Sequence, residues 1–113
     1  MSISFHGIGQ VCATFLGDHI TEGHVVKMSD RGAAAACSDG NDFFGVAMCC
    51  KDDACSVQVK GFVTVGYSGT VPAVGWTALA ANSSGGVRSV SSGGRSYLVV
   101  NTDTTAKTVT IML

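Results

Sequence analysis

Charged residues are scarce in this sequence of 113 residues: Asp, Glu, Lys and Arg make up only 13% of it, and hydrophobic residues make up 46%. An average soluble domain contains about 25% charged residues. A chain of this length forms one domain with a single core and a large surface to cover. We therefore expect part of the uncharged surface to be covered by partners in an oligomer or a complex.

Other absences disfavour whole classes of function. The net charge is −1 and no run of Lys or Arg exists, so no basic face is expected to neutralise the phosphates of a nucleic acid. No stretch reaches the ~18 apolar residues of a membrane span. The start of the chain, MSISFHGIGQ, lacks the basic and apolar regions of a signal peptide, and we expect synthesis in the cytoplasm. The cysteines number 5, and an odd number argues against a complete disulfide framework.

What is abundant favours β-structure. The chain has 15 glycines and 1 proline, and short runs rich in Val, Thr and aromatic residues alternate with turns of Gly, Asn, Asp and Ser. The predicted strands cover residues 11–16, 24–28, 43–50, 55–65, 76–81, 96–100 and 108–113. This spacing predicts an all-β chain, a single small β-barrel or β-sandwich-like domain of about seven to nine short strands.

The motif CCKDDAC, residues 49–55, predicts a hairpin. With KDDA as the loop, the side chains that oppose one another on one apolar face are Cys50 and Cys55, Met48 and Val57, and Val46 and Val59. The other face of the return strand carries Ser56, Gln58 and Lys60, which suit water or a polar interface. Gly61 then interrupts the alternation and predicts a bulge or a bend.

The five cysteines do not have the spacing of a metal site. Cys49 and Cys50 are adjacent and point to opposite faces of a strand, so they are poorly placed to bind one ion together. The histidines, His6, His19 and His24, have no paired spacing that would complete a site. We expect Cys50, Cys55 and Cys12 to be buried free thiols, with a Cys50–Cys55 disulfide as the alternative. Cys37 lies beside a turn and is expected to be the most exposed.

No pattern in the sequence predicts catalysis. No cysteine lies in a nucleophile motif, and Asp52 and Asp53 are ordinary residues for a hairpin tip. The glycine-rich stretches match neither the P-loop nor the dinucleotide fingerprint. Lys27 and Met28 form the Lys-Met pair of biotin-carrying domains, but Lys27 falls within a predicted strand instead of at a hairpin tip. We therefore predict no catalytic residue, no metal and no cofactor.

The order of features from residue 21 onward resembles a known family. TEGHVVKMSDRG is followed by CSDGNDFFGVAM, then by VQVKGFVTVGYSG, VGWTALAANSSGGV and SYLVVNTDTTAKTVTIML. This order is similar to that of the small capsid decoration (cement) proteins of tailed bacteriophages and prophages. The resemblance covers about the last four-fifths of the chain. It implies a β-barrel-like protein, usually a trimer, that binds the outside of the phage head and bridges subunits of the major capsid protein.

The same resemblance implies a division of the chain and a set of contacts. Residues 21–113 would form the β-barrel decoration domain, and residues 1–20, which match poorly, a separate N-terminal segment and a candidate arm over the capsid. Gly23, Gly45, Gly61 and Gly75 would be conformational glycines at turns and bulges. The candidate contacts with the capsid or with another subunit are apolar residues that the hairpin register does not place inside: Ile3, Phe5, Ile8, Tyr67 and Trp76.

Two alternatives remain from other classes. The first is another phage module, of a tail or a fibre, that binds a protein or a glycan. The second is an enzyme or a carrier domain, which a covalent adduct on Lys27 or a copurifying metal would indicate. The favoured interpretation is a structural protein of the virion, made in the bacterial host cytoplasm and located on the outer surface of the capsid.

Overall fold

The computed structural model describes residues 10–17 and 19–113. Within these residues it contains strands and no helix, so the predicted all-β class is confirmed. The ten strands are β1 (Val11–Leu16), β2 (Val25–Asp30), β3 (Ala33–Ala36), β4 (Gly45–Lys51), β5 (Ala54–Lys60), β6 (Phe62–Ser68), β7 (Gly75–Ala81), β8 (Val87–Ser89), β9 (Arg95–Asp103) and β10 (Thr108–Met112).

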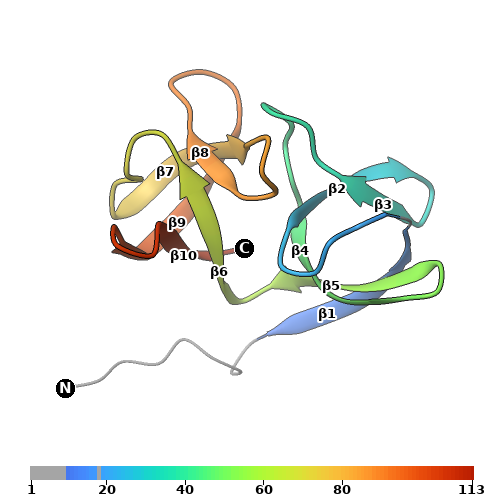
Figure 1. The fold of residues 1–113 in the computed structure, drawn as a ribbon. Helices are drawn as coiled ribbons and strands as arrows, with labels where there is room; N and C mark the ends of the chain where they lie inside the picture. Colours follow the sequence, from blue (N-terminus) through green and yellow to red (C-terminus); the bar gives the residue numbers. More distant parts are fainter. Residues whose placement is uncertain (1–9, 18) are drawn as a thin grey trace.

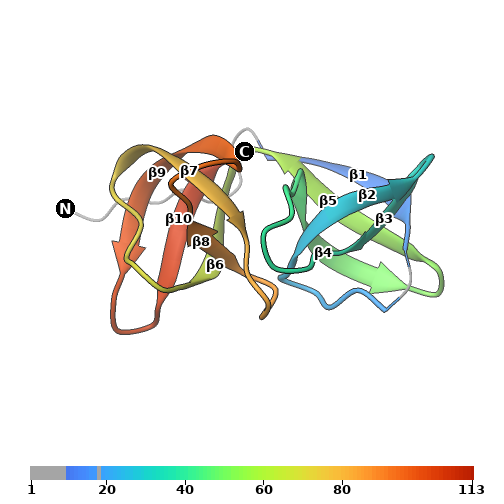
Figure 2. The same ribbon diagram turned by 90° about the horizontal axis from the view of Figure 1, so that it is seen from above.

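The strands close into two five-stranded barrels that lie side by side (Figures 1 and 2). The first barrel has the strand order β1-β3-β2-β4-β5, and the second has the order β6-β8-β7-β9-β10 around its closed sheet. Each strand of the first barrel therefore has a counterpart five places later in the second. The chain contains one five-stranded topology twice in tandem.

The two barrels also share finer details. In each, the first and third strands are parallel, with Leu16 beside Ala33 in one barrel and Tyr67 beside Val87 in the other. The fourth strand of each barrel carries a one-residue bulge opposite the fifth, at Met48 in β4 and at Val100 in β9. A bulge bends its strand and increases the local twist, which helps so few strands to close.

The number of strands differs from the expected seven to nine because of three local features. β3 consists of four alanines and β8 of only three residues, and neither has the β-branched run that identifies a strand. The predicted strand at 55–65 is divided between β5 and β6 at Gly61, whose φ of 101° is readily accessible only to glycine. The bend expected at Gly61 is confirmed, and it forms the junction between the barrels.

Strand structure begins before the expected domain boundary at residue 21. β1 pairs with β5 from Val11 to Leu16 and closes the first barrel through its contact with β3. Residues 11–16 therefore belong to the barrel and not to a separate segment. Of the candidate arm at residues 1–20, residues 1–9 and 18 lie outside the described residues.

The β4–β5 hairpin confirms one part of the predicted register and corrects the rest. Cys50 opposes Cys55 as expected, but Lys51 also pairs with Ala54, so only Asp52 and Asp53 remain at the tip. Beyond this point the bulge at Met48 shifts the register. The partners become Cys49 with Ser56, Ala47 with Val57, and Val46 with Gln58. Met48 is consequently exposed instead of facing Val57 in the core.

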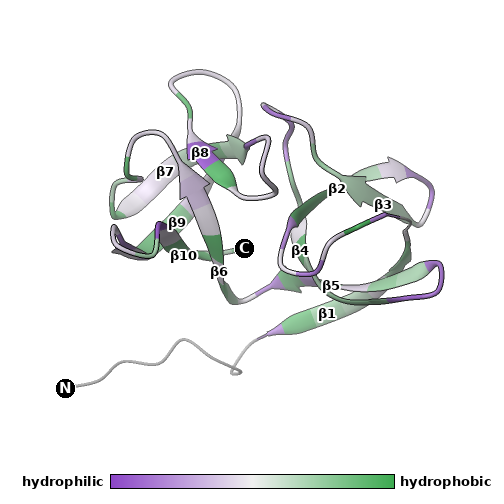
Figure 3. Ribbon diagram, viewed as in Figure 1, coloured by the Kyte–Doolittle hydropathy of each residue, from purple (hydrophilic) through white to green (hydrophobic). Residues whose placement is uncertain are grey.

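The hydrophobic residues form two cores, and β2 contributes to both. Val26 faces a small core in the first barrel with Ala34, Ala47, Cys55 and Val57. Val25, the adjacent residue, faces the larger core centred on the second barrel, which Phe43 and Val46 of the first barrel also join. Adjacent strand residues point to opposite faces, so one strand joins the two cores. The strands are largely apolar and the β4–β5 tip is polar (Figure 3).

The connection between β3 and β4, residues 37–44, ties the first barrel to the second. The rings of Phe43 and Tyr97 are stacked with centroids 4.7 Å apart and an interplanar angle of 6°. The Tyr97 hydroxyl donates a hydrogen bond of 2.6 Å to the carbonyl oxygen of Phe43. Burial raises the pKa of Tyr97 to about 12, although the nearby Arg95 guanidinium acts in the opposite direction. The hydroxyl therefore stays protonated and remains a donor at neutral pH.

Gln58 corrects the expectation of a polar outer face on β5. Its side chain is buried at the junction, where Nε2 donates to the carbonyl oxygens of Lys60 (3.2 Å) and Phe62 (2.9 Å). Its Oε1 accepts a hydrogen bond of 2.9 Å from Gln10. A buried amide is stable when its donors and acceptor are satisfied, and here they fix the backbone on both sides of Gly61.

Candidate interaction surface

Residues 10–17 and 19–113 contain no group of three or more His, Cys, Asp or Glu side chains that could hold a metal ion. His24 lies between the barrels, where its carbonyl oxygen accepts a hydrogen bond of 2.9 Å from the Ala47 N–H. His6 lies outside the described residues. The remaining candidates for a site are the cysteines, Lys27 and the exposed apolar residues.

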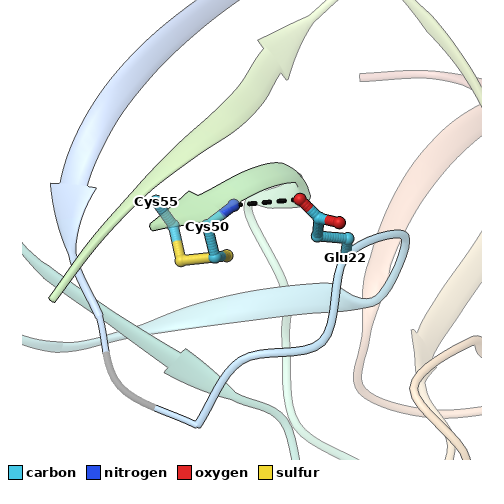
Figure 4. The surroundings of a disulfide bond; sticks show 3 residues. All are labelled: Glu22, Cys50 and Cys55. Atoms are coloured by element: carbon cyan, nitrogen blue, oxygen red, sulfur yellow. Dashed lines mark hydrogen bonds between the residues drawn. A yellow bond between two sulfur atoms is a disulfide. The ribbon is translucent and has the colours of Figure 1, made fainter. Parts of the chain in front are cut away.

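Cys50 and Cys55 form a disulfide across the β4–β5 hairpin, with a Cα–Cα distance of 4.1 Å (Figure 4). The expectation that both are free thiols is wrong, and the alternative is confirmed. The predicted register already placed these side chains opposite each other on one face, which is the arrangement that a cross-strand bond requires. The Cys50 N–H also donates a hydrogen bond of 3.1 Å to Oε2 of Glu22.

The other three cysteines, Cys12, Cys37 and Cys49, are free. Cys12 is exposed on β1 and not buried as expected, and Cys37 is half-buried instead of the most exposed. Cys37 packs against the core of the second barrel. Burial raises the pKa of the Cys37 thiol, and the nearby positive charge of Lys27 counteracts this only partly. A raised pKa leaves less thiolate at neutral pH, which disfavours Cys37 as a nucleophile.

Removing the disulfide should cost stability in a way that a reductant reproduces. The bond has a sequence separation of 5, and closing so short a loop is worth about 2 kcal/mol in the chain-entropy estimate. We expect Cys50→Ser with Cys55→Ser to lower the free energy of unfolding by that amount in urea titrations, and reductant to have no further effect on the variant. Cys49→Ser serves as the control and should change stability little. Five reactive thiols in the unfolded, unreduced chain would contradict the prediction.

Lys27 does not have the setting of a biotinylated lysine. It lies inside β2, it is half-buried, and its Nζ donates a hydrogen bond of 3.1 Å to Oδ1 of Asn41. Oδ1 of Asn41 also accepts a hydrogen bond of 2.8 Å from the Ser38 N–H. Lys27 thus helps to hold the 37–44 connection in place, and its ammonium group is engaged at the boundary between the barrels.

The most exposed large apolar side chains of the second barrel lie in and beside the connection between β6 and β7. Val74 and Trp76 are each 69% exposed, and Val71 is 42% exposed. We call these three residues the 71–76 patch. Burying a large apolar side chain that water now surrounds is worth about 1.5–3 kcal/mol, so this patch is a candidate contact for another protein.

The 71–76 patch is held on a fixed support. Pro72, between its members, is fully buried. The Thr77 hydroxyl donates a hydrogen bond of 2.7 Å to the carbonyl oxygen of Ala73. Trp76 itself lies on β7, paired with Leu98 of β9. A contact residue on a rigid support loses less conformational entropy when it binds.

The predicted contact residues fall into three groups. Trp76 is exposed and belongs to the patch. Tyr67 is only 7% exposed and packs in the second core, so it is a core residue. Ile3, Phe5 and Ile8 lie outside the described residues. Val71 and Val74 were not singled out from the sequence, although the run GTVPAVG offered a signal, since two valines flank a proline in a turn.

Comparison with known protein families, with curated proteins and with solved structures finds no match to this chain. In the part of the chain that the structure describes, no helix is long and apolar enough to cross a membrane.

Proposed function

We propose that this chain is a structural module that binds the outer surface of a phage or prophage head and stabilises the capsid by bridging subunits of the major capsid protein. The observation that carries the proposal is the 71–76 patch, three exposed apolar side chains on a supported connection. Low overall charge agrees with a surface that partners cover. No catalytic activity and no cofactor are part of the proposal.

The two barrels suit a bridging role because both present apolar side chains. The first barrel exposes Val11, Leu16, Met28 and Met48, and the second exposes the 71–76 patch. Contacts with Val25, Phe43 and Val46 join the barrels through one core. A unit with two linked contact surfaces can hold two capsid subunits together, and the second contact forms at high effective concentration once the first has formed.

Binding to heads tests the proposal. Expanded heads assembled from the major capsid protein of the same genome, and lacking decoration, are sedimented with the purified chain. We expect Trp76→Ser to weaken binding at least ~10-fold, because a central aromatic contact is typically worth about 2 kcal/mol or more. Asn101→Ser, which changes an exposed polar side chain outside both apolar surfaces, serves as a control for general surface effects.

Two outcomes would contradict the proposal. If the wild-type chain does not sediment with the heads, the capsid is not its partner, and binding to tail proteins or to glycans becomes the next measurement. If it sediments and Trp76→Ser binds as well as the wild type, the 71–76 patch is not the contact. Folding of each variant is checked by its unfolding transition, so that lost binding is not confused with lost structure.

A further inference from the structure

The second barrel holds a segment of the first against the C-terminal end of β7. The N–H of Gly40 donates a hydrogen bond of 2.8 Å to the carbonyl oxygen of Ala81, and the N–H of Ala81 donates one of 2.9 Å to the carbonyl oxygen of Asn41. Asp39, in the same segment, forms an ion pair of 2.9 Å with Arg88 on β8. The connection between β3 and β4 thus extends the sheet of the second barrel at the edge of β7.

The tandem topology identifies the equivalent position on the first barrel. On β7, Leu79 pairs with Arg95, the first residue of β9, and Ala81 follows two residues later. On β2, Val26 pairs with Gly45, the first residue of β4, so Met28 is the counterpart of Ala81. The neighbouring strand agrees, because Ala81 pairs with Val87 of β8 and Met28 with Ala34 of β3.

The edge of β2 at Met28 is open in the described part of the chain. The carbonyl oxygen of Val26 accepts a hydrogen bond of 3.0 Å from the Phe44 N–H. Backbone groups of alternate residues point to the same side of a strand, so the N–H and C=O of Met28 point past the start of β4. Pairing between β2 and β4 stops at Val26, and no strand pairs with Met28 on this side. Its side chain is 48% exposed.

A cleft of about 450 Å³ lies at the same end of the first barrel, on the β3 side of β2. It is lined by Leu16, Gly17, Ser29, Ala33, Ala34, Ala35 and Asp53. Ser29 follows Met28 in β2, and Ala34 is the cross-strand partner of Met28. Ala35 is equivalent to Arg88. Ala35 pairs with Lys27, which precedes Met28, and Arg88 pairs with Ala80, which precedes Ala81. The small side chains of β3 leave room there.

The second barrel carries a segment that is equivalent to residues 37–41, the segment of the first barrel that contacts β7. Ala36 and Ser89 are equivalent, because they pair with Val26 and Leu79 respectively. The residues that follow are CSDGN (37–41) in the first barrel and VSSGG (90–94) in the second. The equivalent glycines of the two segments, Gly40 and Gly93, both have a positive φ, 88° and 75°. The two segments therefore share a left-handed glycine at the same distance from the preceding strand.

The ion pair in the contact within the chain has an uncharged counterpart at the open edge of β2. In the contact within the chain, Asp39 of the inserted segment meets Arg88 of the receiving strand. At the open edge of β2, the residue equivalent to Asp39 is Ser92, and the residue equivalent to Arg88 is Ala35. Both members of the pair are uncharged, so the 90–94 segment can occupy the open edge without leaving a charge unpaired.

We propose that the open edge of β2 at Met28 receives the 90–94 segment of a second copy of this chain. Within its own chain this segment is tied to the second barrel, where the Val90 N–H donates a hydrogen bond of 3.1 Å to the carbonyl oxygen of Ala78, while residues 91–93 are exposed. The contact between copies repeats the contact within the chain. It is a head-to-tail interface, with different surfaces on the two partners, and such an interface closes into a ring when the rotation allows it. This inference does not depend on the proposed capsid partner.

Cysteine cross-linking of two different single variants tests the interface. Met28→Cys and Ser92→Cys are prepared separately in a chain that also carries Cys12→Ser and Cys49→Ser, and the two proteins are mixed under mild oxidation. A head-to-tail contact predicts that the mixture forms a heterodimer and that neither variant alone forms a homodimer in comparable yield. Met48→Cys mixed with Ser92→Cys is the matched control, because Met48 is also exposed on the first barrel.

Association without cross-links gives a second readout. In sedimentation equilibrium of the full chain we expect Met28→Lys to weaken self-association at least tenfold, because a lysine at an open strand edge opposes pairing with another chain. Met48→Lys should leave association within about twofold of the wild type. A wild-type chain that stays monomeric at 100 µM, or equal homodimer and heterodimer yields in the cross-linking, would overturn the proposal. Neither measurement uses heads, so the result is independent of the test of capsid binding.

Discussion

Replacing Phe43 by alanine is expected to lower the free energy of unfolding by about 3–5 kcal/mol, the usual cost of deleting a buried phenyl ring. Phe43 belongs to the first barrel's connection between β3 and β4, but its ring packs in the core of the second barrel and stacks on Tyr97. The variant would therefore lose the largest of the side chains that join the barrels, while Val25 and Val46 remain. Urea titration monitored by Trp76 fluorescence and by circular dichroism measures the change.

Phe44→Ala is the matched control for Phe43→Ala. Phe44 is the adjacent residue, it is half-buried, and its ring meets Phe15 edge-on with centroids 5.1 Å apart. Less of its surface is removed from water, so its loss should be less than half that of Phe43. Equal losses would mean that the stacking on Tyr97 contributes nothing beyond local burial. Two separate transitions in Phe43→Ala would show that this ring is what makes the barrels unfold together.

Asn82→Ala is expected to lower the free energy of unfolding by about 3 kcal/mol, because several buried polar groups lose their partners at once. Oδ1 of Asn82 accepts hydrogen bonds from the N–H groups of Ser84 (2.8 Å) and Gly86 (2.9 Å). Nδ2 donates to the Ser68 hydroxyl (3.1 Å) and to the carbonyl oxygen of Val87 (3.2 Å). One side chain thus organises the turn between β7 and β8.

The control for Asn82 is Asn101→Ala, which removes an exposed amide from β9. Substitutions of this kind usually change stability by less than about 0.5 kcal/mol. The turn that Asn82 organises also contacts the first barrel, since the Val25 N–H donates a hydrogen bond of 2.9 Å to the carbonyl oxygen of Gly85. Similar unfolding free energies for the two variants would show that water replaces the lost bonds without cost.

The sequence predicts where the strands of this protein lie better than it predicts how they close into two barrels. Each of the seven predicted runs overlaps at least one strand, because β-branched residues and turn residues alternate clearly along the chain. The tandem barrels were not predicted. β3 is made of alanines and β8 of three residues, so a third strand was recognised in neither half, and without it the shared topology could not be deduced.

The errors at particular residues have tertiary causes. Val46, Met48 and Cys50 alternate as a regular strand does, and nothing in this pattern distinguishes a bulge at Met48 from continuous pairing. Gln58 lies between two valines and suggested an outward face, but its amide is satisfied by groups on either side of Gly61. For Cys50 and Cys55, the geometry of the hairpin outweighed the argument from the odd number of cysteines. Of the four glycines expected to be conformational, Gly23, Gly61 and Gly75 have positive φ values. Gly45 does not, and it instead allows the close approach of the Gln58 backbone.

The candidate surface could be predicted only in part. The sequence predicts Trp76 and Tyr67 as exposed apolar contacts; the structure exposes Trp76 but buries Tyr67. Both residues flank the connection from 69 to 74, and the position of an apolar residue beside this connection does not tell whether it points into the barrel. The alternation of buried residues along β6 decides this, since Val63, Val65 and Tyr67 all face the core.

The single-residue junction at Gly61 has a consequence for the order in which the protein is made. All strands of the first barrel precede all strands of the second, so the first barrel can close while the rest of the chain is still on the ribosome. Translation of the second half takes roughly 3–10 seconds at the usual rate of about 5–20 residues per second. During that interval Val25, Phe43 and Val46 have no partner core, and the emerging chain carries an apolar surface that only its own second half will cover.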